Sequence, residues 1–536
     1  MTLAVSTPVA PGPDAAGAHA RLVAALARRL SDGARVEILE THISSVLLTG
    51  RHAYKLKKPV DLGFLDFTTL GARRHFCEQE LRLNRRLAPT LYLDVVAITG
   101  SVDAPVVDGT GEAIDYAVRM REFPQDALLS RVLARGELRP ADVDALAGDV
   151  ARFHAAIDVA PALSPFGSPE TIAAYARRNF IMEDGSSAGA SGRRVLASLA
   201  RWTEDELALR APAMRRRKAD GFVRECHGDL HLGNMASIDG HIVIFDCIEF
   251  NEELRWIDVM SEVAFAAMDL ADRGRPDLAR RFLNGYLEHT GDYGGLSVLR
   301  FYLVYRAMVR AKVAQVRAAQ LGADPKGAAL RAESRGYVVQ ARRYARRGEP
   351  LLIVMHGFSG SGKTTLAQHL LERIDAIRIR TDVERKRMHG VASDRPSAKA
   401  GGNALYSPDA TARTYEQVRD HAATALDAGF AAIADGTFLR RSQRDLLRRL
   451  AVERGVPFVI VDVTADTATL QARLARRARS ATDASDADAA VLALQIRNDE
   501  PLGRDERAHV VAFASGGAPD PGQIARLRAA ASVPFC

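Results

Sequence analysis

Cysteines are scarce in this sequence, and long apolar runs are absent. The chain of 536 residues has four cysteines, which lie far apart and form no C-x-x-C pair, so we expect neither a disulfide framework nor a cysteine-rich zinc site. No apolar run approaches the ~20 residues that cross a bilayer, and the N-terminus lacks the basic and apolar segments of a signal peptide. These absences predict a soluble protein of the cytoplasm without a membrane partner.

Aromatic residues and net charge are also low. Aromatics make up 6% of the chain, and 73 Lys and Arg against 66 Asp and Glu leave a net charge of +7. This small excess suits a protein that handles anionic ligands such as nucleotides, but it does not by itself indicate nucleic acid. Hydrophobic residues at 47% and charged residues at 26% are typical of a globular protein and exclude disorder throughout the chain.

The length predicts more than one domain, since a single core rarely organises so many residues. Residues 1–20 are rich in Ala, Pro, Gly, Ser and Thr, which predicts a flexible tail. A polar break at 347–350 precedes an abrupt apolar strand, so we predict domains over 21–347 and 348–536. In the second domain, strand-like runs alternate with helical stretches, which predicts an α/β fold with a parallel sheet covered by helices.

A phosphate-binding motif follows the first strand of the second domain. The segment GFSGSGKT matches G-x-x-x-x-G-K-[ST] between a strand and a helix. Its glycines let backbone N–H groups turn inward around phosphates, its lysine adds a cation, and its threonine offers a hydroxyl to Mg²⁺. The residues predicted to bind nucleotide are Gly357, Ser359, Gly360, Ser361, Gly362, Lys363, Thr364 and Thr365.

The next strand, at 377–380, leads into a candidate acceptor base. Asp382 follows this strand, and Arg385 comes one helical turn later. Because ligands bind at the carboxyl ends of parallel strands, Asp382 is placed to accept the proton of an attacking hydroxyl, with Arg385 holding an anionic group. The alternative is that Asp382 only caps the helix that follows.

A third strand, at 431–434, ends in Asp435, which we predict to hold Mg²⁺ through water or to orient the acceptor. Further on, Arg473, Arg476 and Arg477 lie in one arginine-rich helix. This pattern is typical of a lid that brings an arginine to the transferring phosphoryl group. The alternative for these arginines is a solvated basic face.

The C-terminal motifs resemble the small P-loop kinases that include polynucleotide kinases, zeta toxins and chloramphenicol phosphotransferase. The resemblance is carried by GFSGSGKTT, by the D-x-x-R of Asp382 and Arg385, and by the D-x-T that begins at Asp435. It covers about 350–510. It implies ATP-dependent phosphorylation of a hydroxyl but no particular acceptor.

The N-terminal domain carries a second catalytic pattern. HGDLHLGN, at 227–234, has the H-x-D-x-x-x-x-N spacing, and the strand after it ends in Asp246. In kinase-type transfer, the first aspartate, here Asp229, engages the acceptor hydroxyl, while Asn234 and Asp246 coordinate Mg²⁺. The alternative groups Asp229 with the two histidines of the motif as a transition-metal cluster.

This pattern resembles the aminoglycoside phosphotransferase and choline kinase group, relatives of protein kinases. The resemblance implies an α+β kinase-like fold for the N-terminal domain, with Asp229 as the catalytic base and Asn234 and Asp246 as metal ligands. It also implies that Asp258 is a buried support for the catalytic loop. Two departures concern the grip on the triphosphate: no G-x-G-x-x-G loop precedes the candidate lysine, and Cys-Ile follows Asp246 instead of Phe-Gly.

The same group pairs a strand lysine with a helix glutamate. We choose Lys55, because the neighbouring Ala53 is small enough to leave room for an adenine ring, over Lys57. For the glutamate we choose Glu80 over Glu78, because Glu80 shares the helix face of the apolar residues around it. Surface salt bridges are the alternative for both residues.

The complete arrangement resembles a bacterial family of bifunctional kinases, in which an aminoglycoside-phosphotransferase-like domain is fused to a P-loop kinase, over nearly the full chain. We therefore expect two sites that use ATP and Mg²⁺ to phosphorylate small-molecule hydroxyl acceptors. One alternative is a nucleotide-binding regulatory protein in which one domain senses ATP without transfer. Another is a nucleic-acid end-processing kinase, which the scarcity of aromatic stacking residues disfavours.

Overall fold

The described part of the chain folds into two compact units. The computed structural model describes residues 13–31, 36–63, 65–181, 189–322, 324–391, 405, 407–480, 488–514 and 519–531. Contacts between Cα atoms group Met1–Asp142, Arg152–Ile172 and Met214–Ala266 as the first unit. The second unit comprises Val143–Ala151, Ala173–Ala213 and Ala267–Cys536. The second unit therefore includes helices that precede residue 348.

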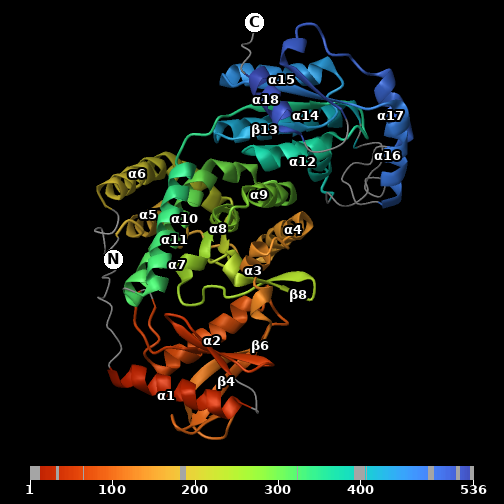
Figure 1. The fold of residues 1–536 in the computed structure, drawn as a ribbon. Helices are drawn as coiled ribbons and strands as arrows, with labels where there is room; N and C mark the ends of the chain where they lie inside the picture. Colours follow the sequence, from red (N-terminus) through yellow and green to blue (C-terminus); the bar gives the residue numbers. More distant parts are fainter. Residues whose placement is uncertain are drawn as a thin grey trace. The chain divides into compact units, whose positions relative to one another are not determined.

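A six-stranded antiparallel sheet forms one part of the first unit, in the order β1-β2-β3-β6-β4-β5. Strand β3 is central, and Lys55 pairs in register with Val46 on one side and Val118 on the other. Helix α2 (Leu70–Asn84) packs against β4 and β6 (Figure 1). The strands are β1 (Glu37–Glu40), β2 (Ser44–Leu48), β3 (His52–Lys57), β4 (Tyr92–Gly100), β5 (Pro105–Val107) and β6 (Ala113–Arg121).

Helix α1 (Pro13–Leu30) begins inside the segment that the sequence predicted as a flexible tail. Its residues Leu22 and Leu26, four positions apart, are buried in one cluster with Leu47 and Leu56 of the sheet. This apolar stripe binds the helix to the sheet, so residues 13–20 are helical and the prediction of a tail was wrong for them. Residues 1–12 lie outside the described residues.

Two short antiparallel strand pairs flank the HGDLHLGN segment of the first unit. Strands β7 (Val223–Glu225) and β10 (Trp256–Asp258) pair antiparallel, as do β8 (Met235–Ile238) and β9 (His241–Ile244). Asp239 and Gly240 connect β8 to β9 with φ of 52° and 80°, as a two-residue I′ turn requires. The remaining elements that lie wholly or partly in this unit are η1 (Gln125–Ala127), α3 (Leu129–Ala134), α4 (Pro140–Ala156), α5 (Pro169–Arg178), α6 (Gly189–Ala219), η2 (Leu232–Asn234), α7 (Glu252–Arg255) and α8 (Val259–Asp272).

Helices make up the first part of the second unit. Helices α10 (Leu296–Leu321) and α11 (Pro325–Tyr344) pack along each other (Figure 1). Helix α9 (Pro276–Thr290) ends at Gly291, whose φ of 73° is typical of a left-handed helix cap. The short η3 (Tyr293–Gly295) joins α9 to α10. Within the ranges given above, no helix has the length and apolar character needed to span a membrane.

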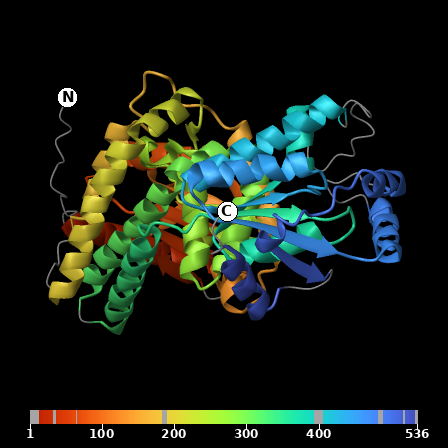
Figure 2. The ribbon, with the colours of Figure 1, turned by 90° about the horizontal axis from the view of Figure 1, so that it is seen from above.

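A five-stranded parallel sheet forms the rest of the second unit, in the order β12-β13-β11-β14-β15. Figure 2 shows its strands running side by side between helices. The strands predicted at 377–380 and 431–434 fall within β12 and β13, and the α/β fold is confirmed. The elements are β11 (Leu352–His356), α12 (Lys363–Arg373), β12 (Ala376–Arg380), α13 (Thr381–Met388), α14 (Pro408–Asp427), β13 (Ala431–Asp435), α15 (Arg441–Arg454), β14 (Phe458–Thr464), α16 (Thr467–Ser480), α17 (Ala489–Arg497), η6 (Arg507–His509), β15 (Val510–Ala514) and α18 (Pro521–Ala531).

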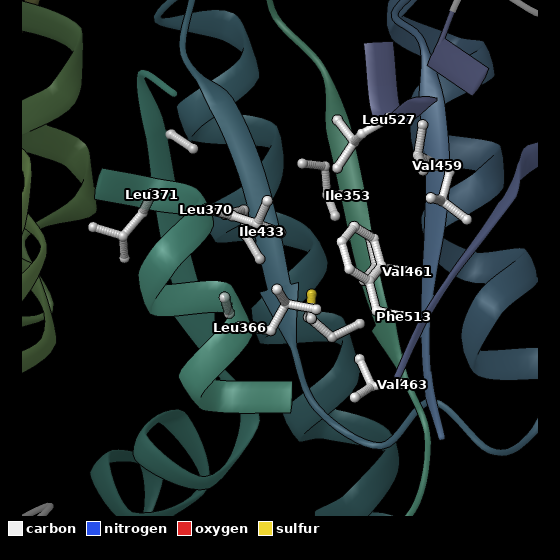
Figure 3. Close-up of a cluster of buried hydrophobic side chains, with 14 of the residues drawn as sticks. Ile353, Leu366, Leu370, Leu371, Ile433, Val459, Val461, Val463, Phe513 and Leu527 are labelled. Atoms are coloured by element: carbon white, nitrogen blue, oxygen red, sulfur yellow. The ribbon is translucent and has the colours of Figure 1, made fainter. Parts of the chain in front are cut away.

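The core of this sheet is built from aliphatic side chains of its strands and of α12 (Figure 3). Leu366 and Leu370 of α12, one turn apart, point at Ile353 of β11 and Ile433 of β13, and all four are buried. β-Branched residues suit strands that are covered on both faces. This packing fixes α12, and with it the loop at the carboxyl end of β11.

Helix α9 covers β12, the edge strand of the parallel sheet. The Asn284 side chain donates to the carbonyl of Ala376 over 3.1 Å and accepts from the backbone N–H of Arg378 over 2.7 Å. It thereby supplies the donor and acceptor that a neighbouring strand would supply. One turn later, Glu288 accepts from the Arg378 guanidinium at 2.6 and 2.9 Å and lies 3.6 Å from that of Arg380. The strand that leads into Asp382 is therefore held from outside the sheet.

Candidate active sites

Both candidate lysines of β3 contact the same glutamate of α2. Lys55 Nζ lies 2.8 Å from Glu80 Oε1, and Lys57 Nζ lies 2.8 Å from Glu80 Oε2. Residues two apart on a strand share a face, and Glu80 is fully buried beneath them. Glu78, on the exposed side of α2, pairs with Arg74 instead. The chosen pair of Lys55 and Glu80 is thus in contact, but Lys57 makes the same contact.

The two lysines differ in their second partners. Lys55 pairs with Asp246, the predicted metal ligand, whereas the buried Lys57 pairs with Glu249. Burial disfavours a charge on Lys55, but Asp246 and Glu80 outweigh it and raise the pKa of Lys55. Burial likewise opposes the charge of Glu80, yet the two lysines lower its pKa. Lys55 therefore connects Glu80 to Asp246, the candidate metal ligand, while Lys57 and Glu249 form a second, buried ion pair.

Asp229 and Asn234 lie in direct contact at the catalytic loop. The Asn234 side-chain amide donates to Asp229 Oδ2 over 2.9 Å, so its nitrogen faces the candidate base and its side-chain oxygen is the atom that could bind a metal ion. The β8–β9 hairpin then returns the chain, and the backbone N–H of Phe245 donates to the backbone carbonyl of Asn234 over 2.9 Å. Asp246, with φ of 64°, follows directly. The oxygen donors at this end of the hairpin fit Mg²⁺.

Glu262 of α8, which the sequence analysis did not single out, holds the backbone of the catalytic loop. Its carboxylate accepts from the N–H groups of His227 and Gly228 over 3.0 and 2.9 Å. Burial opposes its charge, but His154, His227 and the Gly228 amide lower the pKa of Glu262 to about 2. Asp258, which the resemblance assigns as a support, instead accepts from the Arg217 guanidinium at 2.7 and 2.9 Å. The support comes from the residue one helical turn further on.

The contacts of His227 bear on the alternative of a transition-metal cluster. Its Nε2 lies 2.9 Å from the Phe245 carbonyl, and its Nδ1 accepts from the Asp229 N–H over 3.3 Å. Burial lowers the pKa of His227. Both ring nitrogens are thus engaged within the protein, which leaves neither of them for a metal ion. This arrangement favours the kinase-type interpretation of the motif.

The phosphate loop lies between β11 and α12, and glycine backbones make its curvature. Gly357, Gly360 and Gly362 have φ of 130°, 86° and 95°. A Cβ on Gly357 would lie 2.4 Å from the Val463 carbonyl oxygen, so this position admits no side chain. Lys363 Nζ reaches back over the loop and donates to the Phe358 carbonyl over 2.6 Å. The predicted members Ser359, Ser361, Thr364 and Thr365 belong to the same loop and helix start.

Thr364 and Asp435 come together beside this loop. The Thr364 hydroxyl donates to Asp435 Oδ1 over 3.4 Å. Asp435 is 4% exposed, and its Oδ2 is buried with no hydrogen-bond partner among the described residues. Burial raises the pKa of Asp435. A hydroxyl and a buried carboxylate with one unused oxygen form a donor set that fits Mg²⁺.

Asp382 lies in the first turn of α13, whose N-cap is Arg380. It is therefore not the N-cap that the alternative supposed. Asp382 and Arg385 both line a cavity of about 700 Å³ that also contacts Gly362, Lys363 and Asp435. Arg385 is buried and donates to the Leu405 carbonyl and the Thr411 hydroxyl over 3.1 and 3.2 Å. The candidate base, its arginine, the phosphate loop and the metal ligand thus share one cavity.

Two helices of the predicted lid region contact the phosphate loop. Arg473 of α16 donates to the Gly360 carbonyl over 3.2 Å. Gln495 of α17 accepts from the Ser359 N–H and donates to the Ser359 hydroxyl, each over 2.9 Å. Arg476 is exposed on α16, and the side chain of Arg477 lies outside the described residues. Sequence reasoning missed Gln495, because a lone glutamine in a helix carries no motif.

Comparisons with known proteins assign both units. The sequence model described as the phosphotransferase enzyme family matches residues 73–302, and the one described as an AAA domain matches residues 352–502. Uncharacterized proteins of Mycobacterium tuberculosis and Mycobacterium bovis are each 30% identical to this chain over 454 residues, which is 83% of this chain and 88% of theirs.

Two solved structures were also matched to parts of the chain. A choline/ethanolamine kinase family protein of Mesorhizobium loti is 13% identical, with a TM-score of 0.37, and the match covers 61% of this chain and 93% of that one. A putative kinase from Chloroflexus aurantiacus is 21% identical, with a TM-score of 0.25, over 31% of this chain and 86% of that one.

The domain matches, the antiparallel kinase-like sheet and the P-loop sheet together define a two-domain phosphotransferase of the kinase type. The chain belongs to the same family as the mycobacterial proteins. It joins an aminoglycoside-phosphotransferase-like domain to a P-loop kinase-like domain, as the resemblance implied.

Proposed function

We propose that the protein is an ATP-dependent phosphotransferase with two sites, each of which moves the γ-phosphoryl group of Mg·ATP to a hydroxyl of a small molecule. When bound, Mg²⁺ neutralises charge on the phosphates and ATP supplies the phosphoryl group. We also propose residue 348 as the point at which the second kinase domain begins along the chain. The cytoplasm remains the location that the sequence predicts.

In the first site, Asp229 accepts the proton of the acceptor hydroxyl, Asn234 and Asp246 hold Mg²⁺, and Lys55 engages the phosphates. The contact between Lys55 and Asp246 supports this assignment. Before Mg·ATP binds, Lys55 and Asp246 neutralise each other. When it binds, Lys55 can pair with phosphate and Asp246 with Mg²⁺, so neither charge is left unpaired. Glu80 keeps Lys55 oriented throughout this exchange.

In the second site, Asp382 is the acceptor base, the phosphate loop and Lys363 hold the nucleotide, and Thr364 and Asp435 hold Mg²⁺. The buried, unpartnered Oδ2 of Asp435 supports the metal assignment. Arg473, whose guanidinium donates to the Gly360 carbonyl of the phosphate loop, is the lid arginine that we assign to the phosphates.

One observation carries the proposal for both sites. Groups suited to phosphate, to a divalent cation and to an acceptor proton come from distant parts of the sequence and meet at one place in each unit. Lys55 and Asp246 are 191 residues apart, and Thr364 and Asp435 are 71 residues apart. Structural ion pairs alone do not require this combination of residue types.

The experiment that tests the proposal is a metabolite-pool screen with γ-labelled ATP, using the full chain, Asp229→Asn, Asp382→Asn and the double variant. We expect each single variant to lose a different set of labelled products and the double variant to lose all of them. Asp239→Asn and Asp409→Asn are matched controls, since Asp239 lies in the exposed hairpin turn and Asp409 in the first turn of α14. Transfer that survives in the double variant would refute the assignment of the bases.

A further inference from the structure

The cavity of the second site contains more cationic groups than nucleotide binding requires. It has a volume of about 700 Å³ and is bounded by the phosphate loop, the start of α13, and parts of α14, α15 and α17. This volume is within the ~300–1,000 Å³ typical of small-molecule sites. Lys363, Asp382 and Asp435 already have roles in the proposed transfer. The other ionisable lining residues are Arg380, Arg385, Arg440, Arg449 and Glu416.

Helix α15 separates its arginines into two groups. Arg441 and Arg448 pair with Asp505, and Arg444 pairs with Glu506 over 2.6 Å. None of these three lines the cavity. Two other arginines do line the cavity: Arg440, which directly precedes the helix, and Arg449, which lies on it. Neither forms an ion pair with any residue in the described ranges. The carboxylates beside α15 therefore neutralise Arg441, Arg444 and Arg448, which do not line the cavity, and leave Arg440 and Arg449, which do.

We propose that the acceptor of the second site is a small hydroxylated anion, a carboxylate or a phosphate monoester, whose negative group is bound by Arg440 and Arg449. The inference rests on the proposed function of that site. A guanidinium presents a planar pair of N–H donors that matches the two oxygens of a carboxylate or phosphate. The lining has five cationic side chains, Lys363 and four arginines, against the three carboxylates of Asp382, Glu416 and Asp435, and this excess of positive charge disfavours a polycationic acceptor such as an aminoglycoside.

The transfer step then balances without a further reactant. The acceptor hydroxyl oxygen forms a bond to the γ-phosphorus, and the bond from that phosphorus to the β,γ-bridging oxygen breaks. The hydroxyl proton passes to the Asp382 carboxylate, and ADP leaves with the electron pair of the broken bond. Arg440 and Arg449 make no bond in this step, because they hold the remote anionic group and thereby set the position of the hydroxyl.

Binding can be tested separately from transfer. Calorimetry on the full chain saturated with Mg·ADP would titrate glycerate and gluconate as carboxylates, glycerol phosphate and ribose phosphate as phosphate esters, and glycerol, ribose, choline and kanamycin as uncharged or cationic probes. We expect at least one anionic probe to bind, with the carboxylate and ester arms showing which anion is preferred. The double variant Arg440→Gln/Arg449→Gln should weaken that binding about 10- to 100-fold.

The matched control is Arg448→Gln, since Arg448 lies on the same helix but pairs with Asp505 and does not line the cavity. It should leave anion binding within about twofold. Affinity for Mg·ATP should be unchanged in the double variant. The inference is overturned if no anionic probe binds, if the double variant leaves anion binding unchanged or weakens ribose or choline binding to the same degree, or if it weakens Mg·ATP binding to the same degree.

Transfer of label in an Asp229→Asn background separates the two proposals. Asp382-dependent labelling of an anionic probe, with a raised KM for that probe in the double variant, supports both. If a neutral or cationic compound is labelled in an Asp382-dependent way, and the substitutions of Arg440 and Arg449 do not affect this labelling, the proposed acceptor class is wrong but the proposed kinase activity stands. Anion binding that needs both arginines, without any Asp382-dependent labelling across the panel, supports the binding site and counts against the proposed transfer.

Discussion

Replacing Asn284 by alanine tests how much the cover over β12 contributes to stability. Asn284 is 2% exposed, and its amide satisfies the Ala376 carbonyl and the Arg378 N–H of the edge strand. The alanine variant leaves both backbone groups without these partners, and a buried unsatisfied group costs about 1–3 kcal/mol. Water that enters the vacated space recovers part of this cost. We therefore expect the free energy of unfolding of the second unit to fall by about 2–4 kcal/mol.

Tryptophan fluorescence can report this unit alone. The chain has two tryptophans, Trp202 in the second unit and Trp256 in the first. In a Trp256→Phe background, urea unfolding followed by Trp202 should show the Asn284→Ala transition at lower urea with an unchanged slope. Exchange of the Arg378 amide hydrogen should also accelerate, because that N–H loses its acceptor.

The control for this variant is His289→Ala, an exposed position on the same helix. It should change the stability by no more than about 0.5 kcal/mol. If Asn284→Ala is no more destabilising than His289→Ala, the side-chain amide does not support β12 and our reasoning about the edge strand fails.

Further predictions concern the two sites. Because the pKa of Glu262 is lowered from 4.5 to about 2, its contribution to stability is complete above pH 4.5 and is lost as the pH falls towards about 2. In Glu262→Gln, unfolding followed by Trp256 fluorescence should therefore depend less on pH over this range. An unfolding free energy that depends on pH as in the parent protein would contradict the assignment. Lys363→Ala should weaken Mg·ATP binding at the second site, measured by calorimetry in a Lys55→Ala background, since the loop loses its cation. Asp229→Asn and Asp382→Asn should each slow their own transfer by about 10²–10⁴-fold while Mg·ATP affinity stays within about threefold; normal transfer by Asp382→Asn would show that this residue is not the base.

The sequence predicted best those site residues that are close together along the chain. The phosphate loop and HGDLHLGN are contiguous, so spacing alone reveals them. Asp435 was recognised because it ends a predicted strand of the same domain. The contact between Lys55 and Glu80 was also foreseen, because strand and helix periodicity each direct a side chain to one face.

Residues that act through long-range contacts gave no comparable signal. Lys57 and Glu249 are 192 positions apart, and only the fold reveals them as a buried ion pair. The resemblance pointed to Asp258 as the loop support, and nothing in the sequence singled out Glu262, because the sequence does not show which carboxylate of this region faces the loop amides. Residues 13–20 of α1 were predicted as part of a tail, because the Ala- and Gly-rich residues before the apolar stripe of this helix have the composition of a tail.

Helix α9 limits where the chain can be cut between its two kinase-like domains. It lies within the 73–302 range that matches the phosphotransferase family, yet its Asn284 and Glu288 hold the outermost strand of the P-loop sheet. A fragment that starts at residue 349 would present the backbone of β12 uncovered, and bare strand edges recruit other chains. A P-loop segment transferred without α9 would therefore expose this strand edge and be prone to aggregate, so α9 has to accompany the P-loop sheet.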